Sequence, residues 1–348
     1  MTQPAPSLAP TLPPIIAGAR DEIPVLDLAP LRRAAPGARE ALAAELRHVF
    51  ENVGFYFITN HGVPQDLVDR MFEEVKRFHA QPVEAKLKLK INQHNVGYMP
   101  MRGATTRHSQ LSLRNKPNLN EAFFAKRDLP PDHPDVIAGK PFRPANQWPD
   151  DLPGFRETVV AYQNALEGVA TSLLPAYALA LDLPANAFDE AFREPTYTLR
   201  MTHYPQQEVE EEGEFGLAPH TDTSFMTLLA QNRIPGLAIR LPSGKWIDAP
   251  AIDGAFLVNG GDLLRRWTND RFLATPHRVA NRSGQPRYAI PLFFDCGTEY
   301  VMKPFASCIG PDNPCHYDPI TYVEYITWYR NQNFDHARGK DGVALAAS

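Results

Sequence analysis

The stretch GLAPHTDTSFMTLLAQ, residues 216–231, places His220 and Asp222 two residues apart, directly before an apolar run rich in strand-forming residues. Side chains two residues apart on a β-strand point to the same face, so we expect this imidazole and carboxylate to lie together. Both groups are metal ligands, but a metal site needs at least one more. The later segment ATPHRVAN supplies His277 as the third.

Two histidines and one carboxylate on one face of a metal are typical of non-haem Fe(II), because three coordination positions stay open. Zinc is the alternative, although structural zinc sites usually close with four protein ligands. A lone His-x-Asp pair is a weak signal that many chains contain by chance. The order His220, Asp222, His277 and then Arg287, ten residues later, on a β-rich frame is much more specific.

Two kinds of element have to position these residues. Helical periodicity predicts helices over three segments before the candidate ligands, at 38–54, 65–80 and 154–181. A proline-rich, irregular region is expected over 81–152. After about residue 195, seven or eight short β-type runs separated by turn signals predict a double-sheet barrel or jelly roll, and a last helix is expected over 320–334.

Composition excludes several other classes of protein. The chain has 348 residues and a net charge of −5, without the clustered Lys and Arg that a nucleic-acid partner requires. No apolar run approaches the roughly 18 residues of a membrane span, and the proline-rich N-terminus lacks the features of a signal peptide. The three cysteines are too few for a disulfide framework, so we expect reduced thiols and a cytoplasmic location.

Over residues 22–335 the chain resembles the iron(II)- and 2-oxoglutarate-dependent dioxygenases of the isopenicillin N synthase-like, plant-type family. Three early motifs, IPVLDL, VGFYFITNHGVP and FHAQPVEAK, are similar to the N-terminal region of these enzymes. NQWPDDLPGFR looks like their entry to a long central helix. LAPHTDTSFMTLLAQ, VNGGDLLRRWTND, PHRV and RYAIPLFFD resemble their catalytic barrel.

The resemblance implies a mainly β fold with α: a double-stranded β-helix (jelly-roll) core, flanked by an N-terminal α/β region and a long central helix. It also implies a division of the chain into five parts. These are a flexible tail (1–20), an N-terminal dioxygenase region (21–150), a central helical region (151–194), the Fe(II)/2-oxoglutarate dioxygenase jelly roll (195–300), and a C-terminal segment with a helix (301–348).

The resemblance further implies that His220, Asp222 and His277 hold Fe(II). 2-Oxoglutarate would chelate the iron, with its far carboxylate on Arg287, whose guanidinium fork matches a carboxylate in a way that lysine cannot. Tyr204 is expected to bond the same co-substrate. With O2, the enzyme would convert 2-oxoglutarate to succinate and CO2 and hydroxylate, desaturate or cyclise a small organic substrate.

Two departures from the family pattern bear on the co-substrate. The family carries Arg-x-Ser at the anchor, whereas this chain has Arg287-Tyr288-Ala289, and the frequent Asn-Tyr-Tyr-Pro motif is replaced by THYP at 202–205. An iron oxidase of the same fold that does not use 2-oxoglutarate is therefore a second hypothesis. A metal-dependent hydrolase and a non-catalytic ligand-binding barrel are two further hypotheses.

Several side chains are expected to lie near the substrate. Thr223 directly follows the aspartate, and Phe225 and Phe294 flank strand segments that carry the site. Phe123 and Met99 are further candidates. This apolar and aromatic supply favours a mostly apolar or aromatic small molecule.

Overall fold

The computed structural model describes residues 22–106, 111, 116–206 and 214–333. The expected tail at 1–20 lies outside these residues. Within them, no helix is long and apolar enough to cross a membrane.

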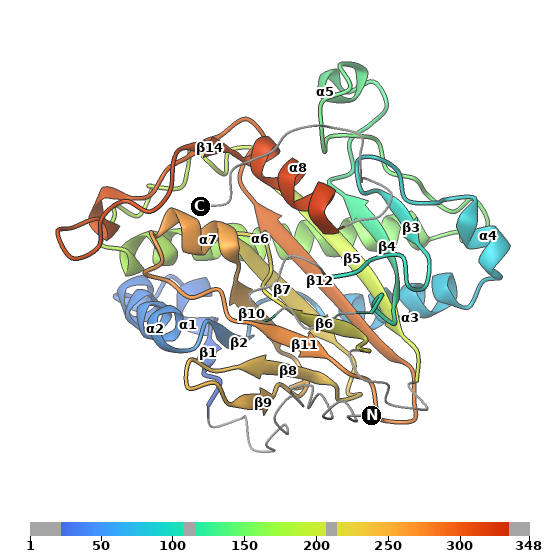
Figure 1. The fold of residues 1–348 in the computed structure, drawn as a ribbon, viewed down its shortest axis with the longest axis horizontal. Coiled ribbons are helices and arrows are strands. Elements are labelled where there is room, and N and C mark those ends of the chain that lie inside the picture. Colours follow the sequence, from blue (N-terminus) through green and yellow to red (C-terminus); the bar gives the residue numbers. More distant parts are fainter. Residues whose placement is uncertain (1–21, 107–110, 112–115, 207–213, 334–348) are drawn as a thin grey trace, which may run out of the picture.

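Two β-sheets enclose the space in which the candidate ligands lie (Figure 1). The larger sheet has the strand order β1 (Val25–Asp27), β2 (Phe55–Thr59), β10 (Phe256–Gly260), β7 (Met226–Gln231), β12 (Arg287–Asp295), β5 (Thr196–Tyr204), β4 (Glu121–Lys126) and β3 (Gly97–Met99). The smaller sheet has the order β6 (Leu217–His220), β11 (His277–Val279), β8 (Leu237–Arg240) and β9 (Trp246–Asp248). Apart from the parallel β1–β2 pair, the named strand pairs are antiparallel. This arrangement is the expected jelly-roll core.

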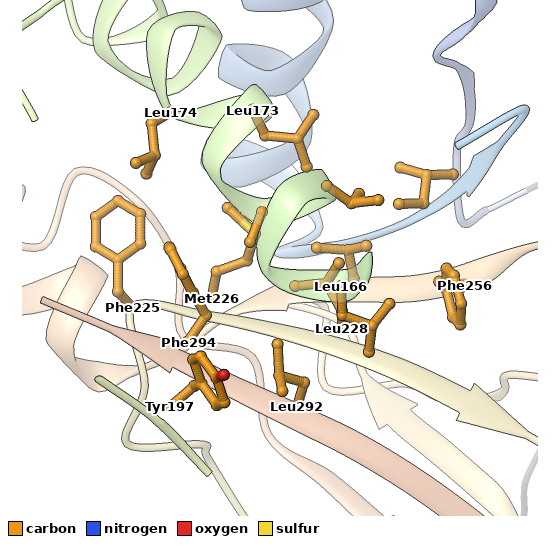
Figure 2. Packing of buried hydrophobic residues seen from close by; sticks show 14 of the residues in the cluster. Leu166, Leu173, Leu174, Tyr197, Phe225, Met226, Leu228, Phe256, Leu292 and Phe294 are labelled. Atoms are coloured by element: carbon orange, nitrogen blue, oxygen red, sulfur yellow. The ribbon is translucent and has the colours of Figure 1, made fainter. Parts of the chain in front are cut away.

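Helices cover the outer face of the larger sheet. Figure 1 shows the long helix α6 (Phe155–Ala180) behind the strands, and α2 (Ala38–Asn52) and α3 (Gln65–His79) both pack against it. Leu166, Leu173 and Leu174 of α6 pack against apolar side chains that point from the strands toward the helix (Figure 2). The shorter helices are α1 (Ala29–Arg32), α4 (Val83–Leu87), α5 (Pro134–Ile137) and α7 (Asp262–Trp267).

The C-terminal part of the described chain contains short elements and one helix. A 3-10 helix (Ala306–Cys308) and a small hairpin, β13 (Val301–Met302) with β14 (Ile320–Thr321), lead into α8 (Tyr322–Asn333). Figure 1 shows α8 lying across the strands of the larger sheet.

Strand alternation separates a helix-facing side from a site-facing side. On β5, Tyr197, Leu199 and Met201 belong to the core under α6. The intervening residues Thr198, Arg200, Thr202 and Tyr204 line the cavities between the sheets. Because side chains alternate along a strand, one sequence run both holds the core together and furnishes the site.

The predicted helices are confirmed, with ends that differ by one or two residues from those expected. The region 81–152 is expected to be irregular, but the structure shows otherwise in part, because β4 lies within it. All six residues of β4 are buried, and they pair with β5 on one side and β3 on the other. Its sequence EAFFAK gives no strong alternation of hydrophobic and polar residues, because both of its faces are covered.

Candidate metal centre

Strand pairing and a tight turn bring the three candidate ligands together. β6 and β11 pair with His277 directly opposite His220. We expect Asp222 on the same strand as His220, but β6 ends at His220. Asp222 lies in the turn beyond the strand. The Asp262 amide donates to the Asp222 carbonyl oxygen at 2.7 Å and fixes that turn. Gly261 permits this approach, because a Cβ there would lie 2.6 Å from the same oxygen.

One atom from each of the three side chains converges on a common point. Asp222 Oδ1 lies 3.7 Å from His220 Nε2 and 3.6 Å from His277 Nε2. The two imidazole centroids are 4.2 Å apart, and one potential ligand atom from each residue lies within 4.8 Å of the others. We refer to His220, Asp222 and His277 as the triad. Its spacing suits a single metal ion.

Hydrogen bonds outside the triad set which atoms face its centre. The Nδ1 of His220 bonds the Ala218 carbonyl at 2.9 Å, and the Nδ1 of His277 bonds the Thr275 carbonyl at 3.2 Å. Since a carbonyl only accepts, each Nδ1 carries the proton and each Nε2 offers its lone pair to the centre.

The carboxylate is oriented in the same way. Asp222 Oδ2 accepts hydrogen bonds from the Thr227 hydroxyl at 2.7 Å and from the Asn259 amide at 2.8 Å. Its Oδ1 is left toward the two imidazoles. The triad therefore presents two nitrogens and one oxygen, each fixed by a partner outside the centre, which is the usual construction around a metal.

The protonation states of His220 and Asp222 suit the same role. Burial, together with the neighbouring His277, lowers the pKa of His220 to about 3, so its imidazole is neutral at pH 7. Burial acts to raise the pKa of Asp222, but the two imidazoles and the Asn259 amide outweigh it, so the carboxylate is ionised. Burial acts to lower the pKa of His277, but Asp222 outweighs it and raises that pKa, so a metal would compete with a proton there.

Two cavities meet at the triad, and both are larger than the ~10–15 Å³ that one water needs. The first, about 50 Å³, runs from the triad to Arg287 and Tyr204. We call it the anchor cavity. The second, about 120 Å³, runs from the triad toward α8. We call it the α8 cavity. Five residues line both: Arg200, Leu217, His220, Asp222 and Phe293.

Arg287 lines the anchor cavity and has hydrogen-bond donors without partners among the described residues. Its side chain is 1% exposed and lies over the Tyr204 ring, with the guanidinium carbon 5.1 Å from the ring centroid. Nη2 donates to Gln231 Oε1 at 2.7 Å, but Nε and Nη1 have no acceptor among the described residues. A buried cation with two unmet donors is costly unless an anion occupies the space beside it. The donor set fits a carboxylate.

The side of β5 that faces the site carries a second buried polar group without a hydrogen-bond partner among the described residues. Thr202 is 1% exposed, its hydroxyl has no partner among the described residues, and it lines the anchor cavity. In the sheet register Thr202 lies directly opposite Ala289, the residue that stands where the family pattern has serine.

Of the residues expected near the substrate, only Thr223 lines either of these two cavities. The structure corrects three others, because Phe123, Phe225 and Phe294 belong to the core under α6. Phe294 stacks on Phe192 with centroids 5.2 Å apart, and Figure 2 shows Phe225 and Phe294 on the α6 side of the sheet. Met99 is 1% exposed and packs with Phe124 in a small separate cluster.

Their sequence neighbours line the α8 cavity instead. Phe124 takes the position expected of Phe123, and Phe293 that of Phe294. Other residues that sequence reasoning missed are Lys126, Thr198, Arg200, Asp295, Tyr322 and Tyr329. Part of the signal was present: Phe293 and Asp295 share the two-residue period of Arg287, and Thr198, Arg200 and Thr202 share that of Tyr204.

A second group of metal-ligand types lies on the other side of β5. His79, Glu121 and His203 also bring potential ligand atoms within 4.8 Å of one another. We call it the Glu121 cluster. Here the Lys86 ammonium donates to Glu121 Oε2 at 2.8 Å, and His203 Nδ1 bonds Glu121 Oε1 at 2.9 Å. Lys86 supplies the positive charge in this cluster.

Comparison with known families gives two matches along the chain. Residues 23–151 match the family model described as the non-haem dioxygenase in morphine synthesis N-terminal domain. Residues 195–295 match the 2OG-Fe(II) oxygenase superfamily. The second match includes the triad and Arg287.

Individual relatives match nearly the whole chain. The chain is 34% identical over 338 residues to the 2-oxoglutarate-Fe(II) type oxidoreductase hxnY of Emericella nidulans, covering 95% of this chain and 93% of that relative. It is similar to a full-length Neurospora crassa protein solved in complex with alpha-KG and thymine, with 27% identity, coverage of 87% and 95%, and a TM-score of 0.76. A 2OG-Fe(II) oxygenase family protein from Caulobacter crescentus has 28% identity, coverage of 88% and 98%, and a TM-score of 0.76.

Proposed function

Because the chain belongs to the 2OG-Fe(II) oxygenase superfamily, we propose that His220, Asp222 and His277 are the ligands of its catalytic Fe(II). One observation carries this assignment: two cavities meet at a triad of two imidazole nitrogens and one carboxylate oxygen, each held by a partner behind it. Three protein ligands on one face leave room for co-substrate and oxygen on the other.

The enzyme is an Fe(II)- and 2-oxoglutarate-dependent dioxygenase. Bound iron supplies oxygen activation, coupling the conversion of 2-oxoglutarate and O2 to succinate and CO2 with oxidation of an organic substrate. The expected oxidase without 2-oxoglutarate is not favoured, since relatives are named as 2-oxoglutarate enzymes and the Neurospora crassa structures hold alpha-KG. The hydrolase and the non-catalytic barrel are set aside for the same reason.

The anchor cavity is proposed as the 2-oxoglutarate site. Arg287 faces it with two unmet donors and Tyr204 lies against the guanidinium, which fits the carboxylate remote from the metal. Thr202 offers a hydroxyl opposite Ala289, so it takes over the hydrogen bond that the family serine would give. The serine is absent, but the cavity does not lack a hydroxyl.

The chain's other contributions are orientation and exclusion of water. Thr227 and Asn259 hold one oxygen of Asp222, so that the other faces the metal position. Phe55 packs edge-on against the His277 ring with centroids 5.3 Å apart, and apolar residues such as Leu229 and Phe293 complete the wall. A dry, fixed site confines the oxidation to the bound substrate.

Other parts of the assignment rest on the sequence. We propose the plant-type, isopenicillin N synthase-like branch, the five-part division of the chain, and a cytoplasmic location in keeping with three free cysteines. A small-molecule substrate is supported by the thymine complex of the related Neurospora crassa protein. Thr223, on the wall of the α8 cavity, remains a candidate for substrate contact.

The test is anaerobic titration of the Fe(II)-loaded protein with 2-oxoglutarate, followed by visible absorbance. We expect a weak charge-transfer band as the co-substrate chelates the iron. Iron bound in stoichiometric amount without any band would contradict the co-substrate assignment.

Arg287→Ala gives a second readout that does not depend on turnover. Hydrogen bonds to charged groups contribute about 1.5–3 kcal/mol, so the Kd for 2-oxoglutarate should rise about 10–100-fold while bound iron is unchanged. Arg233→Ala is the matched control, because Arg233 pairs with Asp253 on the surface. An unchanged Kd in Arg287→Ala would place the anchor elsewhere.

A further inference from the structure

The α8 cavity has an unusual wall for a site expected to take an apolar substrate. Phe124, Phe142, Phe293 and Ile326 give it an apolar part, but two basic residues, Lys126 and Arg200, also line it. Both come from adjacent strands of the larger sheet: Lys126 pairs with Thr198 in the β4–β5 register, and Phe124 with Arg200.

Arg200 is held at the junction of the two cavities without a charged partner. Its Nη2 donates to the Asn120 side-chain oxygen at 2.8 Å, and its guanidinium carbon lies 5.4 Å from the Phe124 ring centroid. Nε is buried and has no acceptor among the described residues. No carboxylate in the described part of the chain forms an ion pair with this arginine.

Lys126 is buried more deeply, with 5% of its surface exposed. Its ammonium donates to Thr198 Oγ1 at 2.8 Å and lies 5.4 Å from the Phe142 ring centroid, again with no ion pair in the described chain. Burial lowers the pKa of Lys126 to about 8, so it is still mostly protonated at pH 7. Buried ammonium groups are expensive unless an anion is close.

The acidic residues of the cavity offset these two cations only in part. Asp222 belongs to the triad. Asp295 accepts from the Phe225 amide at 2.8 Å and from the Tyr322 hydroxyl at 2.9 Å. Asp295 interacts electrostatically with Lys126, and even when fully ionised it supplies one negative charge against the two cations. The wall of the α8 cavity therefore has an excess of positive charge.

We propose that the substrate is a small organic carboxylate, bound with its anionic group between Arg200 and Lys126 and its apolar body against Phe124 and Phe293. This inference rests on the proposed function, because it takes the α8 cavity as the substrate site. It replaces the sequence-based expectation of a mostly apolar molecule with an apolar molecule that carries one acidic group. The acid provides the hydrogen-bond acceptors that the unmet donor of Arg200 lacks.

The experiment uses pairs of probes that differ only in charge. Benzoate, phenylacetate, cyclopentylacetate and indole-3-acetate are each compared with the corresponding primary amide. Each probe is added anaerobically to the Fe(II)–2-oxoglutarate protein, and binding is measured from the change in the visible band. We expect at least one acid to bind, and its amide to bind at least about tenfold more weakly.

The outcomes separate the two proposals. If the band forms with 2-oxoglutarate but no acid of the panel binds, or acids and amides bind equally, the inference is overturned while the proposed function stands. If no band forms although iron is bound, the proposed function fails, and the substrate inference fails with it.

Arg200→Gln and Lys126→Met identify the residues responsible. Each should weaken binding of the acid about tenfold or more, with little change for its amide. Arg127→Gln is the matched control: it removes a cation next to Lys126 that instead pairs with Glu167 and lies over the Tyr197 ring. Unchanged acid binding in Arg200→Gln, or a loss confined to 2-oxoglutarate, would overturn the assignment. Circular dichroism checks folding, and Arg200 alone decides if Lys126→Met does not fold.

Discussion

The triad and the Glu121 cluster contain the same kinds of side chain but are built for different purposes. Each brings one carboxylate and two imidazoles within 4.8 Å of one another. In the triad, Asp222 Oδ2 is taken by Thr227 and Asn259, and Oδ1 is left toward the two imidazoles. Both clusters therefore bring ligand-type side chains together, but they differ in whether a carboxylate oxygen is left free to bind a metal.

In the Glu121 cluster both carboxylate oxygens already have strong partners. Lys86 and the Tyr98 hydroxyl donate to Oε2, and His203 donates to Oε1. Burial acts to raise the pKa of Glu121, but His203, His79 and Lys86 outweigh it and hold that pKa well below its usual value. His79 Nε2 bonds the Met201 carbonyl, which ties α3 to β5. The cluster therefore connects α3 and α4 to the larger sheet through hydrogen bonds, with the Lys86 ammonium in the place that a metal ion could take.

The largest difference is expected when each carboxylate is removed and bound iron is measured. Asp222→Ala takes away one of three ligands, so we expect iron loss and a fall in turnover of about a thousandfold or more. Glu121→Gln should keep one iron per chain. Metal analysis after gel filtration and a succinate assay measure both. Iron retained by Asp222→Ala but lost from Glu121→Gln would reverse the assignment of the two clusters.

The reverse contrast is expected in stability. Glu121→Ala leaves the buried Lys86 ammonium without its counter-charge, which costs about 3–5 kcal/mol in the free energy of unfolding. Urea unfolding of the iron-free protein measures this cost. Glu73→Ala is the control, since its pairing with Lys76 is at the surface and should matter little. A change in Glu121→Ala no larger than in Glu73→Ala would show that the cluster does not hold the fold together.

The sequence allowed prediction of the residues whose chemistry is local and not of those whose chemistry depends on register. His220, Asp222, His277 and Arg287 could be proposed in advance from their types and order. Thr202 could not, because its significance arises from facing Ala289 across two strands that lie far apart in the chain. The same holds for β4, whose buried residues follow no alternation that marks a strand.

The choice of Phe294 was wrong for a different reason. Arg287 fixes the phase of β12, so residues an even number of positions away share its side of the sheet. Phe293 satisfies that condition and Phe294 does not. The information was in the sequence, but it required knowing that the strand is continuous from Arg287 to Asp295.

A smaller effect is expected from the partners behind the triad. Asn259→Ala removes the amide that holds Asp222 Oδ2, and loss of such a partner typically lowers metal affinity by about 10–100-fold. Competition with a fluorescent chelator measures the Fe(II) affinity. Asn281→Ala is the control, since Asn281 is an equally buried amide that bonds the Tyr204 and Gln285 carbonyls instead. Equal losses in the two variants would mean that the effect is structural.

The smallest effect separates two adjacent residues of β5. Thr202 faces the anchor cavity, and His203 faces Glu121. If the Thr202 hydroxyl bonds 2-oxoglutarate, Thr202→Val should weaken its binding by roughly 2–12-fold, which corresponds to one hydrogen bond of about 0.5–1.5 kcal/mol. His203→Phe should lower the free energy of unfolding and leave this binding unchanged. Adding Ala289→Ser to Thr202→Val should restore the binding, because the serine hydroxyl would enter from the opposite strand. Failure of that rescue, with the double variant folded, would show that the two positions are not interchangeable.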